Sequence, residues 1–185
     1  KKKFLIDNIL PLVQLKDKEI SENFSQLFHK NISDIWLEVG FGSGEHIKWQ
    51  LDNNKDIGFI ACEPYINGIA DLLILLDEDH LSRIKIYNGD ARKLFNIFNP
   101  NTFEKVFILF PDPWPKKKHY KRRIIQKSTL NLINAIMTFG GELRLSSDDY
   151  SYVCWIMHHI INDKNYKWTA KCKKDYLDKS DSWPN

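Results

Sequence analysis

Short apolar stretches alternate with longer amphipathic stretches along most of the chain. The short stretches have the length and composition of buried strands, and they lie at residues 34–39, 57–62, 83–87, 104–110 and 142–146. The longer ones place apolar residues at helical spacing, and they lie at residues 43–51, 65–76, 91–98, 122–139 and 149–162. We expect Ser43 to cap the first of these helices, Gly140 and Gly141 to stop the fourth, and residues 167–172 to add a sixth strand.

The alternation of strands and helices predicts an α/β fold with a doubly wound, mostly parallel sheet and helices on both faces. An amphipathic helical lead-in, interrupted by Pro11, precedes the sheet at residues 4–30. No internal repeat or linker divides the chain, so residues 1–185 are expected to form a single domain. Because right-handed crossovers bring the carboxyl ends of parallel strands to one edge, we expect ligands to bind there.

The first expected strand runs into a turn with glycines at alternate positions, Gly40, Gly42 and Gly44. Glycine has no Cβ, so such a turn lets a ligand approach the backbone closely. A dinucleotide turn has the spacing Gly-x-Gly-x-x-Gly, whereas the third glycine here comes one residue early. Glu38 lies two residues before the first glycine. There it would repel a pyrophosphate but suit an amine-bearing ligand.

Acidic residues follow the next two expected strands as well. Glu63 lies about 20 residues beyond the turn, where a carboxylate can accept hydrogen bonds from both hydroxyls of a ribose. Asp90 follows the third strand and can accept from an adenine amino group, while Ala91 leaves room for the ring. S-adenosylmethionine has an amino-acid end, a ribose and an adenine, and therefore satisfies all of these positions.

The fourth expected strand ends in Pro-Asp-Pro-Trp-Pro at residues 111–115. Three prolines in five residues predict a stiff, extended loop that holds Asp112 and Trp114 at the same edge of the sheet. Trp114 can stack on a base or pack the loop against the body, and both interpretations stay open. Asp148 follows the fifth strand. There it can contact the substrate, cap the next helix, or do both.

Positive charge is concentrated directly after this loop. The chain has a net charge of +3, but residues 116–123 contain six Lys or Arg and no acid, so the remainder has a net charge of −3. Lys and Arg neutralise phosphates, which predicts a local site for a polyanion. The three cysteines form no Cys-x-x-Cys pair, which argues against disulfides and a zinc site and fits the cytoplasm. No apolar run approaches the ~18 residues that span a membrane.

Two segments together resemble a known family. Residues 38–44, Glu-Val-Gly-Phe-Gly-Ser-Gly, resemble motif I of class I S-adenosylmethionine-dependent methyltransferases, and residues 110–123 resemble the signature of the tRNA (guanine-N7)-methyltransferases. The resemblance implies a Rossmann-like fold, S-adenosylmethionine as cofactor, no metal, and tRNA as partner, with a variable-loop guanosine as target. It also implies contacts to the tRNA substrate from Lys116, Lys117, Lys118, His119, Lys121, Arg122, Arg123 and Asp148.

Methyl transfer to guanine N7 needs alignment more than a strong base, because N7 carries a lone pair and no proton. Asp112 is the expected catalytic residue, bordering both cofactor and substrate. Its carboxylate can accept hydrogen bonds from guanine N1–H and N2–H, and it can stabilise the cationic methylated base. The sequence does not separate these two roles.

Three other functions compete with this one: a methyltransferase for another RNA or DNA base, a nicotinamide dehydrogenase, and a non-catalytic tRNA-binding subunit. The absence of a Pro-Pro-aromatic motif argues against a base-N6 enzyme, and the glycine spacing argues against a dehydrogenase. The acids at the strand ends argue against a non-catalytic subunit, because a site that had lost its function would not need all of them. Class I methyltransferases close the sheet with a seventh strand, for which we see no room, so we expect either an incomplete C-terminus or a modified fold. The oligomeric state, monomer or homodimer, stays open.

Overall fold

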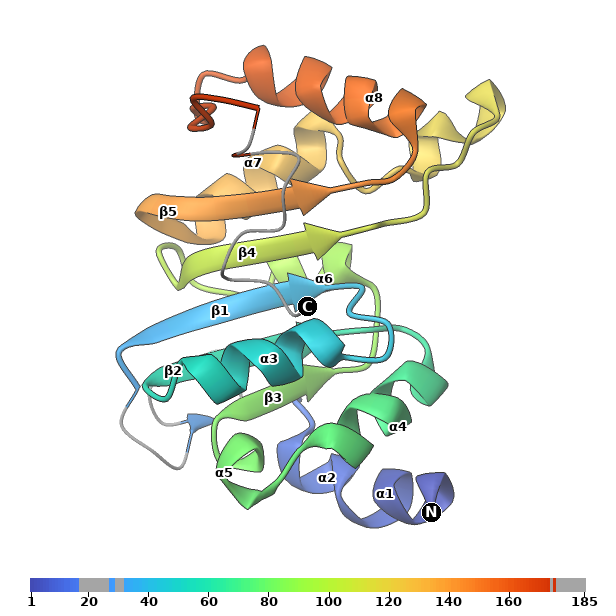
Figure 1. Cartoon of the computed structure of the whole chain (residues 1–185), viewed down its shortest axis with the longest axis vertical. Coiled ribbons are helices and arrows are strands. Elements are labelled where there is room, and N and C mark those ends of the chain that lie inside the picture. The colour runs from blue at the N-terminus through green and yellow to red at the C-terminus, as the bar shows by residue number, and fades with distance from the viewer. Residues whose placement is uncertain (17–26, 29–31, 174, 176–185) are drawn as a thin grey trace.

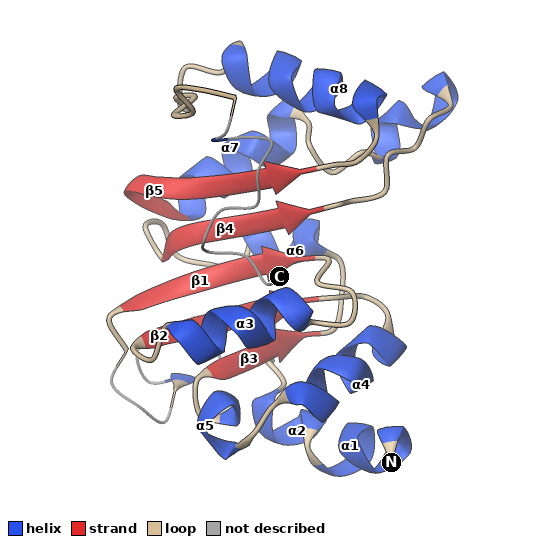
Figure 2. Ribbon diagram, in the orientation of Figure 1, coloured by secondary structure: helices blue, strands red, loops and turns tan. Residues whose placement is uncertain are grey.

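The computed structural model describes residues 1–16, 27–28, 32–173 and 175 (Figure 1). Five strands in this part of the chain form one sheet: β1 (Asp34–Val39), β2 (Ile57–Cys62), β3 (Ile84–Tyr87), β4 (Phe103–Leu109) and β5 (Met137–Ser146). Their order in space is β3-β2-β1-β4-β5, and all neighbouring pairs are parallel. The predicted parallel sheet is confirmed, and its carboxyl edge lies on the right in Figure 2.

Helices cover both faces of the sheet (Figure 2). They are α1 (Lys2–Asn8), α2 (Leu10–Val13), α3 (Glu45–Asn53), α4 (Ile66–Leu75), α5 (Glu78–Leu81), α6 (Ala91–Phe95), the 3-10 helix η3 (Lys117–Arg122), α7 (Lys127–Ile136) and α8 (Tyr150–Ile161). One buried cluster joins α2, α3 and α4 to the sheet, and a second joins α6, α7 and α8 to it.

The two clusters follow the period-2 pattern of the strands. In β1, Trp36 belongs to the α3–α4 cluster, while Leu37 and Val39 belong to the α6–α8 cluster. Phe107 of β4 packs beside Trp36, with ring centroids 5.9 Å apart, and its ring also meets the edge of His46 from α3 at 4.9 Å. The α3 face of the sheet therefore has an aromatic core next to the first strand end.

The predicted helix over residues 122–139 is wrong at both ends. Its first residues belong to η3 and to an extended stretch, and α7 itself occupies only Lys127–Ile136. The residues after Ile136 begin β5, so Gly140 and Gly141 lie within a strand rather than at a helix end. Met137 pairs with Phe103 of β4, and this sheet pairing overrides the helical periodicity of the segment.

Three further differences concern local structure. Residues 167–172 form no strand. The N-cap of α3 is Gly44 in the left-handed conformation, and no side chain caps that helix, so Ser43 does not have the predicted role. The short helix α5 is not among the predicted elements, although Asp77 begins it by accepting a hydrogen bond from the His80 amide.

The lead-in forms α1 and α2 where it is described, with Pro11 in the first turn of α2, a position that tolerates proline. The rest of the predicted lead-in, residues 17–26 and 29–31, lies outside the described residues. In the described ranges no helix is both long enough and apolar enough to cross a membrane.

We expect Gly44→Ala to destabilise the protein more than Gly140→Ala. Both glycines have a left-handed φ, 87° and 80°, which costs another residue about 1–2 kcal/mol. A Cβ on Gly44 would also lie 2.5 Å from Leu72 Cδ1, whereas one on Gly140 meets no described atom within 4 Å. Overpacking at Gly44 then adds about 1–3 kcal/mol. Urea unfolding measures both variants, and equal losses of stability would contradict this account.

Candidate active site

The glycine turn between β1 and α3 has three residues in the left-handed region, Gly40, Gly42 and Gly44, with φ of 74°, 59° and 87°. A Cβ added to Gly40 or Gly42 meets no described atom within 4 Å, so both face open space. Gly44 instead faces Leu72, and its role is the turn itself. A ligand can therefore approach the backbone at Gly40 and Gly42.

Glu38, at the end of β1, is only 2% exposed. Its Oε2 lies 2.7 Å from His46 Nδ1, and His46 Nε2 lies 2.8 Å from the amide nitrogen of Gln50. An amide nitrogen can only donate, so His46 Nε2 accepts and the Nδ1 proton is donated to Glu38. Burial raises the pKa of Glu38, and the hydrogen bond from His46 opposes that shift.

Glu63 joins the glycine turn to the end of β2. Its Oε2 accepts from the Gly42 amide at 3.1 Å, and its Oε1 accepts from the Tyr65 amide at 3.0 Å. The side-chain amide of Asn88, which follows β3, donates to the Glu63 carbonyl at 3.0 Å. Three strand ends are thus tied together, and each Glu63 oxygen keeps a lone pair for a ligand.

Asp90 caps α6 at the third strand end, where its Oδ1 accepts from the Arg92 amide at 2.8 Å. An Arg92 guanidinium nitrogen lies 3.7 Å from the other carboxylate oxygen. Asp90 is exposed, whereas Ala91 is buried beside it. The acid predicted to meet an adenine is therefore open to a ligand while it also begins a helix.

The loop after β4 has an unusual backbone. Phe110 and Trp114 have φ of 49° and 45°, which non-glycine residues rarely adopt. The Phe110 amide donates to the Ser146 carbonyl at 3.0 Å, which continues the pairing of β4 with β5 into the loop. Asp112 lies between these two residues and is exposed. Backbone strain of this kind persists where the surroundings hold a segment in one conformation.

Trp114 packs against the segment that follows it. His119 meets its ring edge-on at 5.7 Å, and the Arg122 guanidinium lies 4.8 Å from the ring centroid. Of the two interpretations left open for Trp114, the structure favours packing. Its contact with a base stays a prediction.

The basic segment divides into two groups. Exposed cations on and beside η3 form a surface next to Asp112, and they are Lys116, Lys117, Lys118, Lys121 and Arg122. His119 is half-buried against Trp114. Arg123 is buried, and its Nε donates to the Pro113 carbonyl at 2.8 Å. Arg123 therefore does not belong to the exposed surface on which the sequence placed it.

Asp149, not Asp148, caps α8. Its Oδ1 accepts from the Tyr152 amide at 2.8 Å and from the Ser151 hydroxyl at 2.6 Å. The hydrogen bond from Ser151, followed by that from the Tyr152 amide, lowers the pKa of Asp149. The capping role predicted for Asp148 is wrong. Asp148 is exposed at the fifth strand end, where its substrate contact stays a prediction.

Comparisons with known proteins show the family of this chain. Residues 33–183 match a family model described as "Putative methyltransferase". The tRNA (guanine-N(7)-)-methyltransferase of Bradyrhizobium diazoefficiens is 35% identical over 173 residues, 93% of this chain and 73% of the relative. The protein of that name from Agrobacterium fabrum is 34% identical over 180 residues, 97% of this chain and 78% of the relative. The chain belongs to the tRNA (guanine-N(7)-)-methyltransferase family.

Solved structures support the fold of this family member. An antibiotic-related methyltransferase has a TM-score of 0.55 at 18% identity, over 81% of this chain and 75% of that one. An rRNA methylase from Streptococcus thermophilus has a TM-score of 0.55 at 11% identity, over 72% of each chain. The Rossmann-like methyltransferase fold expected from the sequence is thereby confirmed.

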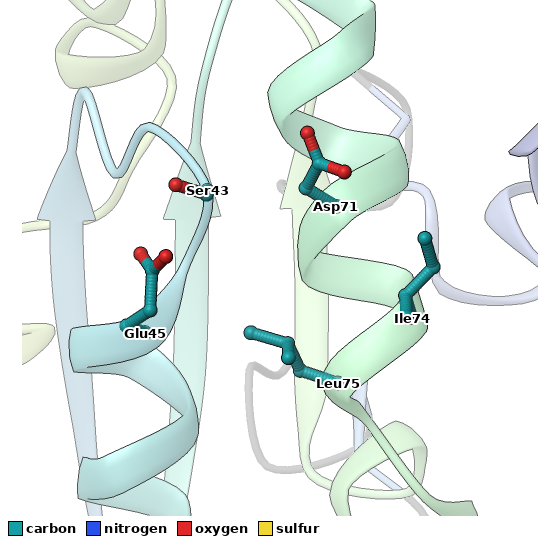
Figure 3. A pocket seen from close by; sticks show the side chains of 5 residues that line it. All are labelled: Ser43, Glu45, Asp71, Ile74 and Leu75. Carbon is teal, nitrogen blue, oxygen red and sulfur yellow. The ribbon is translucent and has the colours of Figure 1, made fainter.

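A pocket of about 220 Å³ lies between α3 and α4 of this methyltransferase (Figure 3). Ser43 of the glycine turn and Glu45 at the start of α3 line one side of it, and Asp71, Ile74 and Leu75 of α4 line the other. It borders the glycine turn, but none of the predicted site residues lines it. Among the described residues, no three His, Cys, Asp or Glu side chains gather as they would around a metal ion.

Sequence reasoning missed two members of this site, His46 and Gln50. Both are buried, and together they hold the Glu38 carboxylate through one face of α3. Their spacing of four residues within the first helix after Glu38 was the available signal. Polar residues at core positions of that helix indicate a buried partner.

We expect Glu38→Gln to raise stability at neutral pH. Because burial raises the pKa of Glu38, the ionised carboxylate destabilises the folded state at high pH. This cost disappears as the pH falls through the raised pKa, whereas glutamine stays neutral and can still accept from His46. The stability difference in urea should therefore shrink toward acid pH.

Glu45→Gln is the matched control, because Glu45 is exposed at the start of the same helix. Its effect should stay within about 1 kcal/mol. A Glu38→Gln protein less stable than the wild type at pH 7 would refute the inference that the buried, ionised Glu38 carboxylate destabilises the folded state.

Proposed function

We propose that this protein transfers a methyl group from S-adenosylmethionine to N7 of a guanine in tRNA. One juxtaposition carries the proposal: an acid-flanked glycine turn and the loop of residues 111–115, continuous with exposed lysines, lie at one edge of a parallel sheet. The name of the relatives, tRNA (guanine-N(7)-)-methyltransferase, supports the choice of base and nucleic acid. The family resemblance also leads us to propose the variable-loop guanosine as target and the cytoplasm as location.

The glycine turn and the residues at the first three strand ends fit S-adenosylmethionine. Gly40 and Gly42 leave space where side chains would stand, and Glu63 keeps acceptor capacity for the ribose hydroxyls. Asp90 and the small Ala91 suit the adenine, and the negative charge of Glu38 suits the amino-acid end. When bound, the sulfonium supplies an electrophilic methyl group.

Asp112 is the proposed catalytic residue. Guanine N7 needs no deprotonation, so the protein's task is to present N7 in line with the methyl group. An exposed carboxylate in a proline-stiffened loop can accept from guanine N1–H and N2–H without loop ordering at the time of binding. The same charge stabilises the cationic product base.

The exposed cations of η3 are the proposed tRNA contacts. They stand next to Asp112 in the chain, so phosphates bound there bring a nucleotide of the same RNA to the loop. Binding of this kind weakens with salt because each neutralised phosphate releases counterions.

We expect Asp112→Ala to lower the rate of methyl transfer at least about 100-fold, because the variant lacks the preorganised carboxylate that stabilises the base electrostatically. Calorimetric binding of S-adenosylmethionine should persist. Mass-spectrometric nucleoside mapping of treated tRNA measures the product, and Asp7→Ala, an exposed acid on α1, is the control. Near-normal turnover by the Asp112→Ala protein would refute the catalytic assignment.

We expect replacement of the three lysines at residues 116–118 by alanine to weaken tRNA binding and reduce its salt dependence. The slope of log affinity against log salt should fall by about 0.7–0.9 for each phosphate that the variant no longer neutralises. The matched control replaces the three exposed lysines at residues 1–3, which lie far from η3 (Figure 1). Fluorescence anisotropy at several salt concentrations measures both. Equal slopes for the two triple variants would exclude η3 as the tRNA surface.

A further inference from the structure

Arg123 differs from every other cation of the basic segment. It is 1% exposed, whereas its neighbours Lys121 and Arg122 are exposed. A fully buried guanidinium cannot neutralise a phosphate in solvent. Since burying a charge is costly, its partners must hold it in a defined place.

Those partners surround the guanidinium. Tyr120, Tyr152 and Trp155 have ring centroids 3.9, 4.9 and 5.0 Å from its Cζ. Its Nη2 donates to the Ser151 hydroxyl at 3.2 Å, and that hydroxyl donates to Asp149. Three aromatic faces and a relayed carboxylate therefore compensate the charge, and four of these five residues belong to α8 or its cap.

The remaining side-chain hydrogen bond of Arg123 reaches the loop of Asp112. Its Nε donates to the carbonyl of Pro113 at 2.8 Å, the residue directly after Asp112. This loop has left-handed backbone at Phe110 and Trp114, so it needs outside contacts to hold its shape. Arg123 is such a contact, and it fastens the loop to α8.

The backbone at Arg122 and Arg123 is also held from the side of the proposed cofactor site. Arg92 Nη2 donates to the Arg122 carbonyl at 3.0 Å and to the Arg123 carbonyl at 3.5 Å. Arg92 also lies 3.7 Å from Asp90, which we place at the adenine. A continuous set of contacts thus runs from Asp90 through Arg92 and Arg123 to the loop of Asp112.

We propose that Arg123 is a positioning residue for methyl transfer, which fixes the Asp112 loop against α8 and does not bind tRNA. The inference rests on the proposed function, because it concerns the placement of Asp112 relative to the bound guanine. A planar, five-donor guanidinium suits the combination of stacking and hydrogen bonding, and a lysine ammonium does not.

The test compares Arg123→Lys with Arg122→Met. Arg123→Lys keeps the charge but removes the planar fork, and we expect its single-turnover rate at saturating tRNA to fall about 10–100-fold, since small misplacements of reacting groups are this costly. Its KM for tRNA and its salt slope should match the wild type. Arg122→Met should show the opposite pattern, in which tRNA binding changes: its KM for tRNA should rise and its salt slope should fall.

Ser151→Ala supplies a second variant should Arg123→Lys fail to fold, as judged by urea unfolding. It removes one hydrogen bond to Arg123, and we expect a rate about 5-fold lower with unchanged tRNA KM. A wild-type rate in either folded variant, or a salt slope reduced in Arg123→Lys, would overturn the inference. The wild-type enzyme distinguishes this outcome from failure of the proposed function. If the proposed function is wrong, the wild type makes no 7-methylguanine; if only the role of Arg123 is wrong, the wild type does make it.

Discussion

Parallel pairing of β3, β2, β1, β4 and β5 brings the loops that leave these strands to one edge of the sheet. Each parallel pair needs a crossover, so every such loop runs from a strand toward a helix on one of the two faces. Hydrogen bonds then join the loops to one another, from Gly42 to Glu63, from Asn88 to the Glu63 carbonyl, and from Phe110 to Ser146. Residues far apart in the chain therefore lie together at one edge because the strands of the sheet are parallel.

Two buried ionisable groups stand behind the two halves of this site. Glu38 lies beside the glycine turn with His46 and Gln50, and Arg123 lies behind the Asp112 loop among three aromatic rings. Apolar residues of similar volume commonly stabilise a core as well as a buried charge does. We therefore interpret both groups as devices for orientation, whose cost in stability other parts of the core offset.

The basic segment places exposed cations and a buried one within a few residues of each other. Its exposed cations can act on a phosphate at a distance and through a high dielectric, so their exact placement matters little. Arg123 acts through directed contacts at short range, and Trp114 between His119 and Arg122 packs the loop onto the same segment. The loop of residues 111–115 is thus connected to the exposed cations of η3 through Trp114, and to α8 through Arg123.

The sequence by itself determined the features that depend on local chemistry. The five strands lie within a residue or two of their predicted ranges except at the start of β5, and the glycine turn has the left-handed backbone that its three glycines allow. The basic segment and the proline loop were visible as composition, which needs no tertiary context.

Only the tertiary structure decided which charged residues face solvent and where α7 begins and ends. Arg122 and Arg123 are identical in type and adjacent, yet one is exposed and one is buried, because α8 brings Tyr152 and Trp155 to only one of them. Asp148 and Asp149 likewise differ only by which of them meets the first turn of α8. Met137 begins β5 because Phe103 of β4 pairs with it, and the pairing of the two strands resumes at Glu142 after a register shift. Each of these outcomes depends on contacts between segments distant in the chain, which periodicity and composition do not encode.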